Sequence, residues 1–317
     1  MWGSERVAAL DWGSFYLRED MHVLLVNDTW SLCPQPVGHH IVRNKWVYKI
    51  KQKPDGSVDW SKALFDLGFT GSHVDYSLFT LHRDKLHIFI LVYVDDIIVT
   101  GNDDSTIFSI ISQLKFEFVI KDWCGLSYFL GIEAARDDTG LHLCQSKYIA
   151  DLLDCANMVG ARSYKVPCIS YSKMSKFDGD LLNDPSEYRH IVEALQYVTI
   201  TCPDIAYSVN QLCQHMQAPT STHWTSAKRV LRYLKHNTDF GLHYKPSIIA
   251  LHAFCVSDWA SNPDDSRSSS GYGIFIGQCL VSWSSKKQLV VSRSSNEAEY
   301  RSLALTTAEV YWVRMLL

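Results

Sequence analysis

The most constraining feature of this sequence is a pair of adjacent acids inside a long apolar run. Asp95 and Asp96 lie between the hydrophobic segments 88–94 and 97–100, both rich in β-branched residues. Such segments favour strands, and the pair between them predicts a hairpin with carboxylates at its tip. Because a carboxylate among apolar side chains needs a cation or hydrogen bonds, a divalent metal at the tip would offset its desolvation. The alternative is that Asp is a favoured turn residue and merely closes the hairpin.

Length and composition indicate a globular protein. With 317 residues the chain is long enough for about two domains. It is 47% hydrophobic and 20% charged, which suits a soluble protein with real cores. A formal net charge of -4 argues against indiscriminate binding of nucleic acid, although a local basic stripe would still serve.

Cysteine spacing and apolar run lengths bear on the compartment. The nine cysteines include no C-x-x-C pair, so we expect free thiols rather than a disulfide framework or a zinc site. Residues 1–20 lack the apolar core of a secretory leader. The longest apolar run, 88–94, is too short to span a bilayer. We therefore expect a cytoplasmic or nuclear protein that is neither secreted nor held in a membrane.

Apolar periodicity predicts the elements of the first half of the chain. Ser105 is expected to cap a helix with an apolar stripe at Ile107, Ile110, Ile111 and Leu114. The other predicted helices are at 21–26, 60–69 and 145–155, and the helix at 60–69 is expected to end at Gly68. Strands are predicted at 45–51, 128–134 and 141–143.

The second half begins with helices and ends with strands. The polar segment 160–183 indicates a linker or domain boundary. Helix starts follow at Asp184-Pro185 and at Pro203. Strands are predicted at 251–257, 271–276 and 280–284, before a helix at 297–317.

A third helix in this region carries a basic face. Its cations are Lys228, Arg229, Arg232 and Lys235. One interpretation is that this face binds along a nucleic-acid backbone. The alternative is that it is an ordinary solvated helix surface.

A series of ordered motifs carries a family resemblance. They are Asn27-Asp28-Thr29-Trp30, Lys45-Trp46-Val47-Tyr48-Lys49, Tyr76-Ser77-Leu78-Phe79, Tyr93-Val94-Asp95-Asp96, Tyr128-Phe129-Leu130-Gly131-Ile132-Glu133, Pro203-Asp204-Ile205-Ala206-Tyr207, Leu231-Arg232-Tyr233-Leu234-Lys235, Ser282-Trp283-Ser284-Ser285-Lys286-Lys287-Gln288 and Ser292-Arg293-Ser294-Ser295-Asn296-Glu297-Ala298-Glu299-Tyr300. In this order they resemble the reverse transcriptase and ribonuclease H of Ty1/copia-type retrotransposon Pol polyproteins.

The resemblance implies an α+β fold in four parts. These are a fingers-like remnant (1–59), a palm-like reverse-transcriptase remnant (60–165), a helical thumb or connection region (166–245) and a partial ribonuclease H-like α/β domain (246–317). It also implies RNA-directed DNA synthesis by two-metal phosphoryl transfer, with Asp95 and Asp96 holding Mg²⁺. The implied partners are an RNA template, a DNA primer and RNA–DNA hybrid.

Departures from the family pattern bear on activity. The junction of Asp59 and Trp60 looks like a long internal deletion, which would remove the nucleotide-binding basic segment and the third metal-binding Asp. A site short of one ligand should bind metal poorly and align the reacting atoms badly, and a shift of about 1 Å costs roughly 10²-fold in rate.

The ribonuclease H motif departs as well. Val256 stands where the family has its first Asp, while Asp258 and Glu299 match acidic positions and are the expected metal ligands there. The chain stops at Leu317, before the strand that brings the family's next catalytic Asp. Alternatively, Asp258 ends a strand and Glu299 is a solvated acid near a helix N-terminus.

Three interpretations follow. In the first, the chain is a reverse transcriptase and ribonuclease H remnant that is impaired or inactive. In the second, it is a non-catalytic nucleic-acid-binding or interaction protein that uses the helices at 186–245. In the third, the sequence comes from a mis-spliced gene model, and the missing palm segment lies in the genomic DNA between the codons for Asp59 and Trp60.

Overall fold

The computed structural model describes residues 6–10, 60–93, 96–118, 120–169 and 173–317. The chain divides into two compact units, and the second begins at Ser127. The helix expected at 21–26 and the strand expected at 45–51 lie outside the described residues.

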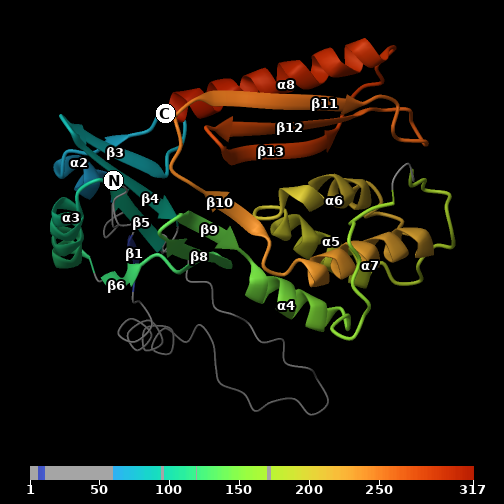
Figure 1. Ribbon diagram of the computed structural model, residues 1–317, viewed down its shortest axis with the longest axis horizontal. Helices are drawn as coiled ribbons and strands as arrows, with labels where there is room; N and C mark the ends of the chain where they lie inside the picture. The colour runs from blue at the N-terminus through green and yellow to red at the C-terminus, as the bar shows by residue number, and fades with distance from the viewer. Residues whose placement is uncertain (1–5, 11–59, 94–95, 119, 170–172) are drawn as a thin grey trace, which may run out of the picture. The chain divides into compact units, whose positions relative to one another are not determined.

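The first unit is built on one antiparallel sheet (Figure 1). Its strands follow the order β2-β3-β4-β5-β1-β6. The elements of this unit are β1 (Arg6–Leu10), α2 (Trp60–Asp66), β2 (Thr70–Gly71), β3 (Leu78–Arg83), β4 (Leu86–Tyr93), β5 (Asp96–Gly101), α3 (Asp104–Glu117) and β6 (Ile120–Gly125).

One face of this sheet packs against α2 and α3. Apolar side chains alternate along β4 and β5, so that Ile88, Ile90, Ile97 and Val99 are buried on the same side. The predicted stripe of α3 is confirmed, because Ile107, Ile110, Ile111 and Leu114 are all buried in the same core as Leu64 of α2. Helical and strand periodicity together therefore determine this core.

The end of α2 confirms the prediction at Gly68. The Gly68 N–H donates to the Phe65 carbonyl at 2.9 Å, and the Phe69 N–H donates to the Leu64 carbonyl at 3.0 Å. This is a Schellman ending, and it requires the left-handed backbone that Gly68 adopts at φ 89°.

The expected cap of α3 was wrong. Asp103, not Ser105, caps the helix, since its carboxylate accepts from the Thr106 N–H at 2.8 Å. The Ser105 hydroxyl instead donates to the same carboxylate at 2.7 Å. Both residue types are good N-caps, so the sequence pattern alone did not discriminate between them.

The second unit contains two sheets and a helical layer. Its elements are β7 (Tyr128–Phe129), β8 (Ile132–Asp137), β9 (Gly140–Cys144), α4 (Ser146–Cys155), α5 (Ser186–Val198), a 3-10 turn (Pro203–Ile205), α6 (Ala206–Cys213), α7 (Ser221–His236), β10 (Gly241–Tyr244), β11 (Leu251–Asp258), β12 (Ser269–Ile276), β13 (Cys279–Lys287) and α8 (Ser295–Leu316). The sheets are β10-β9-β8-β7 and β11-β12-β13.

Two expectations change in the second unit. The single strand predicted at 128–134 is divided into β7 and β8, because Leu130 and Gly131 turn the chain at φ 47° and 78°. The segment 127–165, assigned from sequence to the palm-like part, lies in the same compact unit as the helices.

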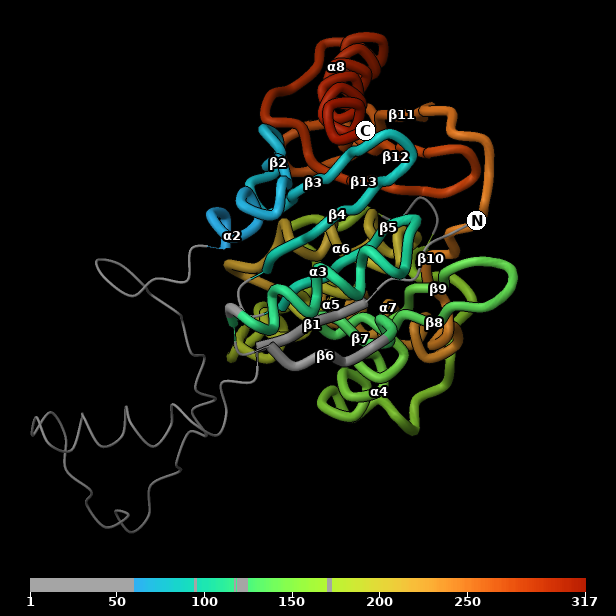
Figure 2. Tube along the Cα trace, turned by 90° about the vertical axis from the view of Figure 1, so that its left-hand side faces the viewer, coloured from blue at the N-terminus to red at the C-terminus, as the bar shows by residue number. Residues whose placement is uncertain are grey.

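Amphipathic helices form the main core of this unit. Helices α4 to α7 bury Ile149, Tyr188, Leu195, Val209 and Leu231 together. Helix α8 runs along the three-stranded sheet in Figure 1 and is seen nearly end-on over the same sheet in Figure 2. Its fully enclosed residues, Ala298 and Ser302, are small, which lets the helix approach the sheet closely.

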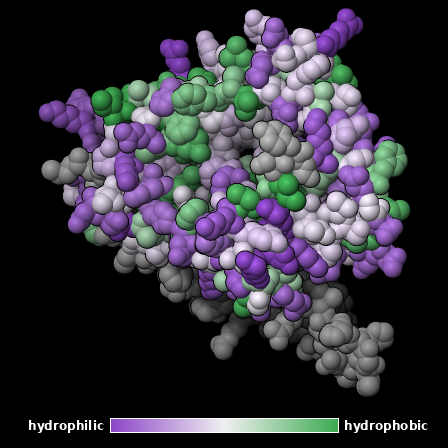
Figure 3. Space-filling view, turned by 45° about the vertical axis from the view of Figure 1, so that its right-hand side comes forward, coloured by the Kyte–Doolittle hydropathy of each residue, from purple (hydrophilic) through white to green (hydrophobic). Residues whose placement is uncertain are grey.

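None of the described helices is long and apolar enough to cross a membrane. Hydrophilic and hydrophobic side chains are interspersed over the face drawn in Figure 3.

Candidate functional site

The two strands of the predicted acidic hairpin pair with each other. Strands β4 and β5 are antiparallel, and Tyr93 is the pairing partner of Asp96. Val94 and Asp95, the two residues between them, lie outside the described residues. Asp96 is half-buried, and its backbone also pairs with Ala9 of β1. Asp96 therefore stands on an interior strand, which holds its backbone in place from both sides.

The base of the hairpin is closely packed. Gly101 pairs with Ile88. A Cβ atom at Gly101 would lie 2.7 Å from the His87 carbonyl oxygen and 2.3 Å from the Ile88 side chain. Such distances leave no room for a side chain, so only glycine fits at this end of β5.

The donor chemistry of the hairpin suits a hard cation. Carboxylate oxygens are the ligands that Mg²⁺ prefers, and it often takes one or two of them together with substrate phosphates. Within the described part of the chain, no three His, Cys, Asp or Glu side chains come together as a metal site. Among the described residues, Asp96 therefore belongs to no complete protein cage for a metal, and Asp95 lies outside the described residues.

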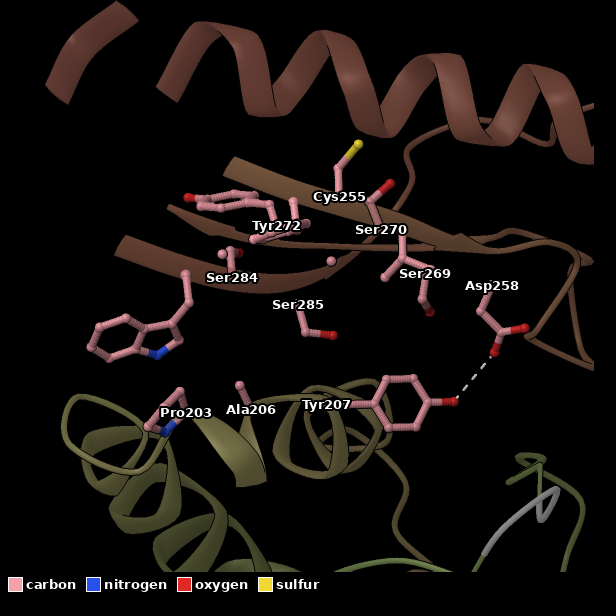
Figure 4. A pocket seen from close by; sticks show the side chains of 15 residues that line it. Pro203, Ala206, Tyr207, Cys255, Asp258, Ser269, Ser270, Tyr272, Ser284 and Ser285 are labelled. Carbon is pink, nitrogen blue, oxygen red and sulfur yellow. Dashed lines mark hydrogen bonds between the residues drawn. The ribbon is translucent and has the colours of Figure 1, made fainter. Parts of the chain in front are cut away.

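The second candidate site is a cavity between α6 and the sheet β11-β12-β13 (Figure 4). Its volume is about 440 Å³, and Tyr207, Phe254, Val256 and Asp258 are among its lining residues. The Tyr207 hydroxyl donates to Asp258 Oδ2 at 3.4 Å. Burial raises the pKa of Tyr207, and the nearby Asp258 charge raises it further, so this phenol stays protonated at neutral pH.

The structure does not bring Glu299 to this cavity. Asp258 points toward α6, on the sheet face opposite α8, which carries Glu299 (Figure 4). Glu299 is exposed. Its neighbour Glu297 accepts from the Arg293 N–H at 2.8 Å and pairs with Arg301 at 2.8 Å. Hydrogen bonds from Arg293 and Arg301 lower the Glu297 pKa, which is typical of a structural acid in the first turn of a helix.

The four cations of α7 are half-buried rather than exposed. The Lys228 ammonium lies 4.7 Å from the centre of the Trp224 ring. The Arg229 and Arg232 guanidinium groups lie 4.7 Å and 5.3 Å from the centre of the Tyr164 ring. The Lys235 ammonium donates to the carbonyls of Ala161, at 2.7 Å, and Val159.

Two aromatic residues at these sites were not predicted. Tyr164 lies in the polar segment expected to be a linker, and nothing in its local pattern indicates that it contacts α7. Tyr207 belongs to the motif Pro203-Asp204-Ile205-Ala206-Tyr207, which marked family membership but not a contact with Asp258.

Comparison with known proteins defines the class. A family model described as reverse transcriptase (RNA-dependent DNA polymerase) matches residues 57–170. The retrovirus-related Pol polyprotein from transposon RE1 of Arabidopsis thaliana is 46% identical over 275 residues, which cover 86% of this chain and 19% of that protein. The corresponding polyprotein from transposon TNT 1-94 of Nicotiana tabacum is 30% identical over 287 residues, or 86% of this chain and 22% of that protein.

A shorter relative matches along nearly its whole length. An uncharacterised mitochondrial protein of Arabidopsis thaliana is 43% identical over 226 residues, which cover 71% of this chain and 94% of that protein. The chain thus belongs to the reverse transcriptase family of Ty1/copia-type retrotransposon Pol polyproteins, as the motifs predicted. It spans about a fifth of the length of the RE1 and TNT 1-94 polyproteins.

Proposed function

We propose that this chain is a retrotransposon-derived RNA-directed DNA polymerase region whose catalytic site is impaired. The observation that carries the proposal is the β4–β5 hairpin, in which Tyr93 pairs with Asp96 beside the Asp95 position. In this role Asp95 and Asp96 would hold Mg²⁺ through their carboxylates. When bound, the metal would stabilise the attacking and leaving oxygens of phosphoryl transfer to a primer end.

The impairment follows from ligand number. By family resemblance, the third metal-binding Asp would belong to a segment that is missing at the Asp59–Trp60 junction. Two adjacent carboxylates give a weak and poorly oriented site. We therefore expect little or no polymerisation by this polypeptide. RNA template and DNA primer are the proposed partners.

Primer extension tests the proposal. The full chain is incubated with an RNA template, a DNA primer and deoxynucleotides, in Mg²⁺ or in Mn²⁺. Extension is expected to be absent or far below that of an intact relative. Robust extension that Asp95→Ala abolishes would show that the site is complete and overturn the impairment. Asp66→Ala serves as a control, because Asp66 is an exposed acid outside the hairpin.

The sheet β11-β12-β13 with α8 is proposed to be a ribonuclease H-like domain that lacks cleavage activity. The proposal is supported by the antiparallel order of the three strands and the helix packed on them. Val256 offers no oxygen ligand at the position of the family's first Asp. The substrate class proposed for this domain is RNA–DNA hybrid.

A further inference from the structure

The cationic face of α7 is covered by a short segment of the same chain. We call residues 159–165 the strap. The strap contains no helix or strand, and most of its side chains are exposed. It is attached to α7 at two points. The Tyr164 N–H donates to the Arg232 carbonyl at 3.0 Å, and its ring lies near two guanidinium groups. The Val159 and Ala161 carbonyls accept hydrogen bonds from the Lys235 ammonium.

The two arginines beneath Tyr164 have side-chain N–H groups without hydrogen-bond acceptors among the described residues. Arg232 Nη1 donates to the Tyr164 hydroxyl at 3.3 Å. The Nε atoms of Arg229 and Arg232 are buried, and neither has a hydrogen-bond acceptor among the described residues. A buried charged donor without an acceptor is unfavourable, so a ligand that supplies anionic oxygens here would gain affinity.

The Tyr164 ring lies within cation–π distance of both guanidinium groups, at 4.7 Å from Arg229 and 5.3 Å from Arg232. Guanidinium planes are common platforms for unpaired nucleobases, and aromatic rings and bases stack on them in the same way. The α7 cations lie on one helix face, since residues 228, 232 and 235 follow helical spacing. Arg162 and Lys165 of the strap, close to Tyr164 in the sequence, are exposed cations. Cations on one helix face together with guanidinium planes favour binding of a polyanion that also carries flat rings.

We propose that Arg229 and Arg232 form a base-stacking site for single-stranded nucleic acid, and that Tyr164 occupies this site until such a strand displaces the strap. The inference rests on the proposed function only in taking nucleic acid as the class of partner. It requires no particular level of polymerase activity, so robust primer extension, which would overturn the proposed impairment, would leave it intact.

Binding of a labelled oligothymidylate to the full chain, followed by fluorescence anisotropy, tests the proposal. Tyr164→Ala opens the site and is expected to bind about 5- to 150-fold more tightly than the wild type, the range that stacking of one base gives. Tyr164→Phe keeps the ring and is expected to bind like the wild type. Lys165→Ala removes an exposed charge without opening the site and is expected to weaken binding slightly. Adding Arg229→Ala and Arg232→Ala to Tyr164→Ala should abolish the gain.

Two results would overturn the proposal. One is a folded Tyr164→Ala variant, verified by its thermal melting curve, that binds no more tightly than the wild type. The other is an equal gain for an oligoglutamate peptide, because charge without stacking would then explain the effect.

A measurement on the wild type does not depend on variant folding. Displacement of the strap by oligothymidylate should accelerate tryptic cleavage after Arg162 and Lys165 severalfold. Cleavage that is unchanged or slowed at saturating oligothymidylate would contradict displacement.

Discussion

The imidazole ring of His215 stacks on that of His223, with ring centroids 3.8 Å apart and planes inclined by 13°. Both side chains are buried. The Thr220 N–H donates to His223 Nδ1 at 3.0 Å, so this nitrogen carries no proton in the folded state. The pair joins the first turn of α7 to the loop after α6.

This stack makes stability sensitive to acid. Burial, followed by the charge of His223, lowers the pKa of His215 from 6.5 to about 4, with Asp264 and Asp178 opposing and Lys287 reinforcing the shift. Burial also lowers the pKa of His223. The unfolded chain therefore binds more protons than the folded chain between pH 6.5 and pH 4, and the free energy of unfolding falls as the pH is lowered through this window.

The expected loss from His215 is about 3 kcal/mol across that window. Urea unfolding at several pH values measures it. His215→Phe keeps a stacked ring and removes the titrating group, so its stability should depend less on pH. An identical pH dependence in the variant and the wild type would contradict this assignment.

Substitution of Gly101 should loosen the base of the acidic hairpin. Gly101→Ala places a methyl group 2.7 Å from the His87 carbonyl oxygen. We expect a loss of about 1–3 kcal/mol in the free energy of unfolding, the usual cost of overpacking. Gly160→Ala is the matched control, because no atom lies within 4 Å of a Cβ there. Equal melting temperatures for the two variants would refute the close approach.

Restoring one carboxylate should not restore ribonuclease H activity. Val256→Asp is expected to fold, since the Val256 side chain is 61% exposed. It is expected to leave RNA–DNA hybrid uncut in Mg²⁺, because Asp258 and Glu299 lie on opposite faces of the sheet. Hybrid cleavage is followed on a denaturing gel. Cleavage by Val256→Asp that disappears on adding Glu299→Gln would show that these acids act together.

Thiol reactivity should follow burial. Burial raises the pKa of the Cys202 thiol to about 11, so almost none of it is thiolate at neutral pH. Cys155 and Cys168 are exposed. Brief treatment of the native chain with a maleimide, followed by peptide mass spectrometry, should find Cys155 and Cys168 modified and Cys202 intact. Denatured protein, in which all three react, is the control, and rapid labelling of native Cys202 would contradict its enclosure.

The sequence alone determined the elements whose signals are local. The stripe from Ile107 to Leu114, the ending of α2 at Gly68 and the hairpin around Asp96 all formed as predicted, because each depends on neighbours within a few residues. The ordered motifs also identified the family correctly. The cap of α3 was assigned to Ser105 rather than Asp103, since both side chains meet the same local requirement.

Only the tertiary structure decided which distant side chains meet. Tyr164 lies 65 and 68 residues before Arg229 and Arg232, yet its ring covers both. Asp258 and Glu299 were both expected as metal ligands of one ribonuclease H site, but they lie on opposite sides of a sheet. Such contacts depend on how whole elements pack and on the path of irregular segments, and neither property is encoded in the periodicity of any one segment.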